Sequence, residues 1–81
     1  METLLNQITP QFQEHSWQFT KTNDNSCRFS KKTKEFQINV LGNSIEVLVP
    51  LKESDSLYKT NFDNYFSASE YLMEHLNYQE N

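Results

Sequence analysis

Glycine, cysteine and histidine are scarce in this chain of 81 residues, which contains one glycine, one cysteine and two histidines. A single glycine excludes the glycine-rich loops that cradle nucleotide phosphates. A single cysteine excludes an internal disulfide framework, and with only two histidines it argues against a closed tetrahedral zinc site. We therefore expect a reducing compartment, no metal and no cofactor.

Long apolar runs are also missing, as are a signal peptide and an Asn-x-Ser/Thr glycosylation site. A helix that spans a membrane needs about 20 predominantly apolar residues, so we expect no membrane association. Secretion is not expected either, because nothing in the sequence directs the chain to that route. These absences predict a cytoplasmic or otherwise intracellular protein.

Apolar residues make up only 36% of the chain, but aromatic residues make up 14%. Because each aromatic side chain buries a large area, a small core can form despite the low apolar content. The length suits one domain over residues 1–81.

The clearest pattern lies between residues 36 and 49. Apolar and polar residues alternate on either side of Gly42-Asn43, which indicates two half-buried strands. Gly and Asn both tolerate the positive φ of a two-residue hairpin turn. Turn and alternation then agree on one register. The pairs expected on the apolar face are Val40 with Ile45, Ile38 with Val47, and Phe36 with Val49.

Two earlier strands are predicted at residues 17–22 and 27–29. Asn23-Asp24-Asn25 between them forms a turn, which we expect to be a three-residue loop with Asn25 left-handed. A loop of even length around Lys32-Thr33 then leads into the hairpin. One face of the resulting four-stranded antiparallel meander carries the apolar side chains Trp17, Phe19, Cys27, Phe29, Phe36, Ile38, Val40, Ile45, Val47 and Val49.

Helices are expected at both ends of the chain. Residues 2–15 show helical spacing, but Pro10 removes a backbone hydrogen bond, so we predict one broken segment that is either kinked or split there. A second helix over 68–78 is predicted from Ser67 as the N-cap, Glu70 in a capping box, and a hydrophobic staple of Phe66 with Tyr71. The predicted fold class is therefore α+β: two layers, with both helices packed on one face of the sheet in the order α-β-β-β-β-α.

Residues 50–66 are ambiguous, because Tyr58 and Phe62 fit strand alternation and also fit helical spacing with Tyr65. Connections of this length are uncommon in compact domains and are often functional. We expect Phe62 and Phe66 to cover one end of the sheet, and Tyr58 and Tyr65 to be exposed.

Candidate catalytic groups are few. Cys27 could pair with His15 or His75, but no feature of the sequence brings them together. The thiol falls on the apolar face of the predicted sheet, where cysteine acts as a small core side chain. Glu74 and His75 point about 100° apart on a helix, so they form a solvated face rather than a metal site. We expect no enzymatic activity.

The net charge of −4 is unevenly distributed, because residues 21–35 are basic and residues 46–80 are acidic. Aromatic side chains beside acidic ones are typical of protein-binding surfaces. By elimination we expect a non-catalytic protein-binding module: an adaptor, an accessory subunit, or a small acidic inhibitor of the kind that viruses and phages encode. The residues predicted to bind the partner are Asp55, Tyr58, Asp63 and Tyr65.

An alternative hypothesis is nucleic-acid binding through the loop at residues 28–34. Its basic side chains could contact phosphates, although the acidic half of the chain makes this the weaker hypothesis. The residues predicted for this role are Arg28, Lys31, Lys32 and Lys34. An unpaired edge strand also invites pairing with another chain, so self-association through 17–22 or 44–49 is a further hypothesis.

Overall fold

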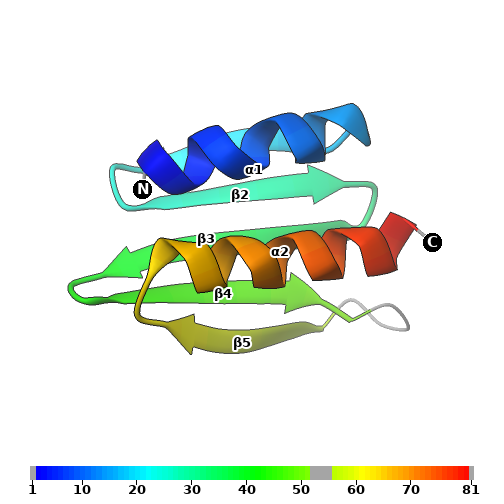
Figure 1. The fold of residues 1–81 in the computed structure, drawn as a ribbon. Coiled ribbons are helices and arrows are strands. Elements are labelled where there is room, and N and C mark those ends of the chain that lie inside the picture. The colour runs from blue at the N-terminus through cyan, green and yellow to red at the C-terminus, as the bar shows by residue number, and fades with distance from the viewer. Residues whose placement is uncertain (1, 52–55, 81) are drawn as a thin grey trace.

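The computed structural model describes residues 2–51 and 56–80, which form a five-stranded antiparallel sheet with two helices on one face (Figure 1). The strands lie in the sheet in chain order. The elements are α1 (Glu2–Glu14), β1 (Gln18–Asn23), β2 (Ser26–Lys31), β3 (Lys34–Leu41), β4 (Ser44–Pro50), β5 (Leu57–Phe62) and α2 (Tyr65–Glu80). The α+β class and the antiparallel meander are confirmed, whereas the prediction of four strands is wrong.

The additional strand, β5, comes from the ambiguous stretch between residues 50 and 66. It pairs antiparallel with β4, and Val47 lies opposite Thr60. The pairing follows from backbone chemistry, because the outer N–H and C=O groups of β4 would otherwise lack hydrogen-bond partners. The expected edge at 44–49 is therefore wrong, since β4 is internal, and the expected edge at 17–22 is confirmed as β1.

The central hairpin has the predicted register, with Val40 opposite Ile45. Gly42 begins the turn at φ 60°, a left-handed conformation that favours glycine. The turn between β2 and β3 is also two residues long and begins with Lys32 at φ 57°. It places Phe29 opposite Phe36, as the sequence predicts.

The connection between β1 and β2 differs from the prediction. Asn25 is not left-handed, and an irregularity between Lys21 and Asn23 shifts the register instead. This bulge supplies the extra residue that keeps Phe19 opposite Phe29, because a bulge sets two residues against one. The Asn23 side chain accepts a hydrogen bond from the Asn25 N–H at 2.8 Å and closes the turn.

Helix α1 is continuous and contains Pro10, so the predicted break is wrong. Leu4, Ile8 and Phe12 are fully buried along one stripe of the helix. Pro10 lies on the exposed side, where water can solvate the carbonyl group that loses its helical partner. Burial of the apolar stripe therefore outweighs the cost of the proline.

Helix α1 ends in two overlapping backbone hydrogen bonds. The Trp17 N–H donates to the Phe12 carbonyl at 3.0 Å, and the Ser16 N–H donates to the Gln13 carbonyl at 3.0 Å. This is the Schellman arrangement, in which the residue after the helix is left-handed. Ser16 occupies that position with φ 69°, where glycine is the usual residue.

Helix α2 begins earlier than the sequence predicts. The Asn64 side chain accepts a hydrogen bond from the Ser67 N–H at 2.7 Å, so Asn64 caps the helix and Ser67 does not. Phe66 is 69% exposed, so the predicted staple is wrong. The helix also continues to Glu80, beyond the predicted end at residue 78.

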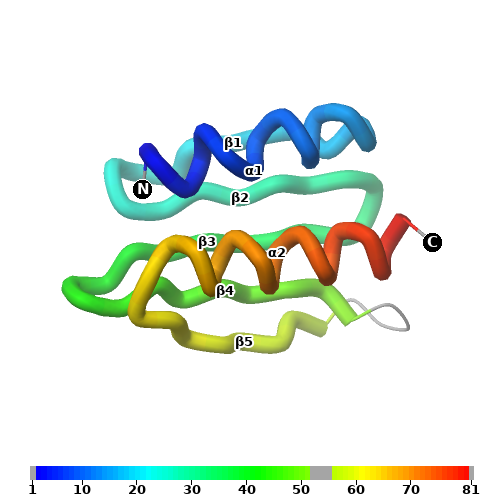
Figure 2. Tube along the Cα trace, in the orientation of Figure 1, coloured from blue at the N-terminus to red at the C-terminus, as the bar shows by residue number. Residues whose placement is uncertain are grey.

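The core lies between the sheet and the two helices. Figure 2 shows α1 over the β1–β2 side of the sheet and α2 over β4. The predicted apolar face of the sheet is buried except at Phe19, which is 36% exposed because β1 is an edge strand, and Val40, which is half-buried. Across residues 2–51 and 56–80, no helix has the length and apolar character needed to cross a membrane.

The opposite face of the sheet has no helix over it (Figure 1). A row of side chains crosses all five strands on this face: Thr20, Arg28, Gln37, Leu48 and Lys59. Polar side chains elsewhere on this helix-free face also bond to one another. Glu46 accepts a hydrogen bond from Asn39 at 3.0 Å and lies 3.8 Å from the Lys59 ammonium group.

Candidate protein-binding surface

The only cysteine is part of the core, as the sequence predicts. Cys27 is buried on β2 opposite Ile38, and burial raises the pKa of its thiol to about 11. A thiol with such a pKa stays protonated near neutral pH and is a poor nucleophile. The His75 ring packs against the Tyr71 ring, with the two ring centroids 4.4 Å apart. Among the described residues, no three His, Cys, Asp or Glu side chains gather into a group able to hold a metal ion.

The four basic residues of the predicted nucleic-acid loop do not form one surface. Arg28 points to the helix-free face of the sheet and lies 3.7 Å from the Glu35 carboxylate. Lys31 and Lys34 share the opposite face because they are cross-strand partners. Lys34 donates a hydrogen bond to the Leu51 carbonyl at 2.6 Å, and Lys32 is exposed in the turn.

Lys31 joins the end of α2 to the sheet. Its ammonium group donates to both carboxylate oxygens of Glu80, at 2.7 and 2.9 Å. The Trp17 indole N–H donates to the same carboxylate at 2.9 Å. Chiefly through the Lys31 hydrogen bond, the pKa of Glu80 is held below its usual value. This cluster is a structural clamp, because it ties the last turn of α2 to β2 and to the residue that precedes β1.

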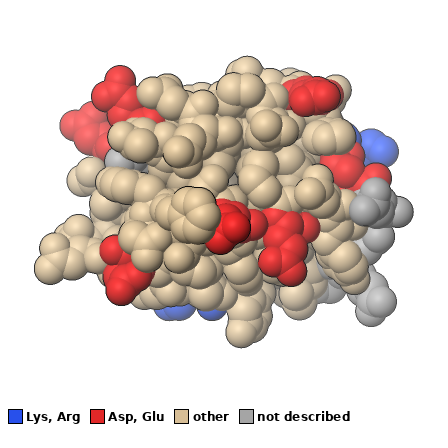
Figure 3. Space-filling model, in the orientation of Figure 1, with Lys and Arg blue, Asp and Glu red and all other residues tan. Residues whose placement is uncertain are grey.

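The two helices carry only negative charge. All seven Lys and Arg residues lie between residues 21 and 59, so neither helix contains one. The glutamates of the helices are Glu2, Glu14, Glu70, Glu74 and Glu80. Figure 3 shows acidic side chains distributed over the helical face, with basic ones only at its margins.

Helix α2 presents a stripe of exposed side chains at intervals of four residues: Phe66, Glu70, Glu74 and Tyr78. Residues at this spacing are neighbours on a helix, about 6 Å apart. Tyr78 is 54% exposed, and together with Glu74 it lines a shallow hollow that also includes His75 and Asn77. The α2 stripe, as we call these four residues, thus sets two carboxylates between two exposed aromatic rings.

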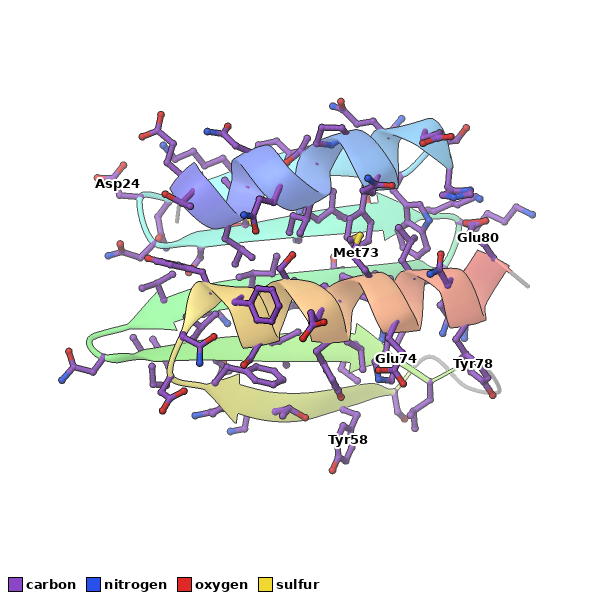
Figure 4. The ribbon with its side chains drawn as sticks, viewed as in Figure 1. Asp24, Tyr58, Met73, Glu74, Tyr78 and Glu80 are labelled. Carbon is purple, nitrogen blue, oxygen red and sulfur yellow. The ribbon has the colours of Figure 1, made fainter. Side chains whose placement is uncertain are left out.

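The residues predicted to bind a partner have different surroundings. Tyr58 is 57% exposed on β5, and Asp63 is exposed in the turn before α2. Tyr65 is half-buried and packs against the core. Asp55 lies outside the described residues. In Figure 4 Tyr58 extends beyond β5, and Glu74 and Tyr78 point from α2 toward the same side of the molecule.

The aromatic residues of this region also divide differently from the prediction. Phe62 was expected to cover one end of the sheet; it is itself a residue of β5, and its ring packs against Tyr71 with centroids 5.1 Å apart. Phe66 was expected to do the same, but it is exposed because α2 begins before it and turns it outward. Tyr78 was not predicted as a site residue. Its spacing of four residues from Glu74 is the signal in the sequence that links it to the acidic stripe.

Comparison with known proteins identifies no relative. No family model, no curated protein and no solved structure matches this chain. A functional hypothesis therefore depends on the geometry and charge of the surface itself.

Proposed function

We propose that this protein is an intracellular, non-catalytic interaction module that binds a basic segment of another protein through the acidic, aromatic surface of α2. The α2 stripe is the observation that carries this proposal. Two exposed rings flank two exposed carboxylates on a helix that contains no Lys or Arg. The burial of the Cys27 thiol, which raises its pKa, supports a non-catalytic role.

The chemistry of the stripe favours a partner rich in Lys and Arg. Glu70 and Glu74 can pair with cations at a spacing of about 6 Å. The faces of Phe66 and Tyr78 can hold a cation or the aliphatic stem of a long basic side chain. Exposed aromatic side chains are also the most common anchors of protein interfaces. Tyr58 and Asp63 lie outside the stripe and extend the same acidic, aromatic character toward β5.

Nucleic-acid binding has less support than protein binding. Arg28 and the pair formed by Lys31 and Lys34 lie on opposite faces of the sheet, so they cannot contact one stretch of phosphates together. Lys31 is also held by the Glu80 carboxylate. A partner that carries phosphates would be repelled by the glutamates of both helices.

The test compares partner capture by two double variants that remove the same charge. Glu70→Gln with Glu74→Gln neutralises the α2 stripe, whereas Glu2→Gln with Glu14→Gln neutralises the exposed glutamates of α1. We expect the α2 variant to lose the captured protein and the α1 variant to retain it. Equal retention by both variants, or equal loss, would contradict the proposal.

A further inference from the structure

The two borders of the sheet differ in what they offer another strand. β5 forms the border beyond β4, and α2 lies over β4, so no helix blocks this border (Figure 1). β1 forms the opposite border, on the side covered by α1. Which border can accept a strand depends on where the backbone groups of each edge strand point.

One backbone hydrogen bond between β3 and the turn before β2 sets the direction of these groups across the sheet. The Val40 N–H donates to the Asn25 carbonyl at 2.8 Å, so Val40 points toward β2. Backbone groups alternate in direction along an antiparallel strand, so Asn39 points toward β4 and bonds with its partner Glu46. Ile45 and Val47, on either side of Glu46, therefore point toward β5.

The same alternation continues into β5. Thr60 lies opposite Val47 and Phe62 lies opposite Ile45, so both direct their backbone groups inward. The Leu51 N–H donates to the Ser56 carbonyl at 3.0 Å, which agrees with this pattern just beyond the strands. The residues that direct their N–H and C=O groups outward are Leu57, Lys59 and Asn61.

The border at β1 is interrupted by comparison. Thr20 bonds inward to Arg28, so the outward residues are Phe19 and Lys21. The bulge after Lys21 ends the regular run. Although the backbone groups of Lys21 point outward, its charged side chain lies on the helix side of the sheet, next to that of its partner Cys27. Bulges and inward-facing lysines are devices that prevent edge strands from pairing. β5 pairs with β4 without a bulge and carries one edge lysine, Lys59, which lies on the helix-free face of the sheet.

We propose that the protein forms a two-fold symmetric homodimer in which β5 pairs antiparallel with β5 of a second copy. Hydrogen bonding requires outward residues to face outward residues, which leaves two registers that overlap five residues of β5. One is centred on Lys59 and sets two ammonium groups opposite each other, which is unfavourable. The other is centred on Thr60 and moves the two ammonium groups from directly opposite to diagonal positions, which weakens their repulsion.

The register centred on Thr60 makes β5 complementary to itself. Tyr58, which is exposed, lies opposite Phe62 of the second copy on the helix side of the sheet. Aromatic pairs of this kind stabilise antiparallel strands. On the other side, Lys59 lies opposite the uncharged Asn61 of the second copy. Tyr58 would then lie in the seam, whereas all four residues of the α2 stripe belong to α2 and none belongs to β5.

The first test measures the mass of the protein in solution by size-exclusion chromatography with light scattering, over a range of concentrations. We expect twice the 9.6 kDa of one chain. Asn61→Pro removes an outward N–H group and is expected to give a monomer, whereas Lys21→Pro removes one from the β1 border and is expected to leave the dimer intact. A wild-type protein that stays monomeric, or a dimer that only Lys21→Pro dissociates, would overturn the proposal.

A second test reads the register and does not depend on a proline variant folding. In the proposed dimer the two Thr60 residues form a non-hydrogen-bonded pair with Cα atoms about 4.5 Å apart, which suits a disulfide. Mild oxidation should therefore cross-link Thr60→Cys, but not Tyr58→Cys, which faces Phe62 of the second copy. The native Cys27 is buried and does not interfere. Failure of Thr60→Cys to cross-link, or equal cross-linking of Tyr58→Cys, would refute the Thr60-centred dimer.

Discussion

Replacing Phe12 by Ala should remove the centre of the aromatic core. The Phe12 ring stacks on Phe29 with centroids 4.2 Å apart. It also forms T-shaped pairs with two further rings. The centroid distances are 4.9 Å to Phe36 and 5.7 Å to Trp17. Phe12 is fully buried, so it joins α1 to β2 and β3 through a single side chain.

The expected loss follows from these contacts. Truncation of a buried Phe to Ala costs about 3–5 kcal/mol, and aromatic pairs contribute about 0.5–1.5 kcal/mol each beyond burial. Three such pairs place Phe12→Ala in the upper part of this range, at about 4–5 kcal/mol. A domain of this size is stable by about 4–12 kcal/mol in total. The variant is therefore expected to be close to unfolding, while Phe12→Leu, which retains most of the volume, should lose much less.

The assay is urea unfolding followed by far-ultraviolet circular dichroism and by the fluorescence of Trp17, the only tryptophan. Phe66→Ala is the matched control, because it makes the same truncation at an exposed position of α2 and should change stability by less than about 0.5 kcal/mol. A loss below about 2 kcal/mol for Phe12→Ala, or an equal loss for both variants, would show that the aromatic cluster does not hold the two layers together.

Two further predictions concern the ends of the helices. Because the folded-state pKa of Glu80 is lowered, its contribution is present above the usual glutamate pKa of 4.5 and is lost as the pH falls through the folded value. Glu80→Gln should therefore cost about 1 kcal/mol near pH 7 and much less in acid, measured as the difference between urea midpoints; a difference that does not change with pH would contradict this. Ser16→Gly should raise stability by about 0.5–1 kcal/mol, because glycine relieves the left-handed conformation, and a lower thermal midpoint for Ser16→Gly would contradict the reasoning.

The central hairpin was predictable from the sequence because two independent signals agree there. The alternation of apolar residues selects a face, and Gly42 selects the turn. A shift of one residue would have turned Ile38 and Val47 to the solvent. No tertiary information is needed for this step, so the register and the buried face are both confirmed.

The fifth strand could not be predicted with the same certainty, because its aromatic spacing fits two periods. Tyr58 and Phe62 satisfy strand alternation, and the same residues continue into the helical pattern of α2. Pairing with β4 decides between them, and that contact joins residues distant from any local signal. The helix cap was missed for a related reason, since Asn64 and Ser67 are both good caps and the structure uses the earlier one.

The candidate surface was only partly accessible from the sequence. The acidic, aromatic character of residues 50–80 was visible, but exposure was not. Tyr65 packs inward and Phe66 outward although they are adjacent, because the direction of each ring depends on where α2 begins. Tyr78 lies within the predicted helix, but its 54% exposure, which makes it a candidate, depends on how α2 packs on the sheet.

The division of charge between the helices and the rest of the chain gives the molecule an electric dipole moment. Its negative pole lies on the helices, and its positive contributions come from the strands and turns. In the field of a cationic partner such a molecule experiences a torque that rotates its helices forward before the surfaces touch. This orientation acts over roughly one Debye length, about 8 Å at physiological ionic strength, so added salt should slow encounter more than it speeds release.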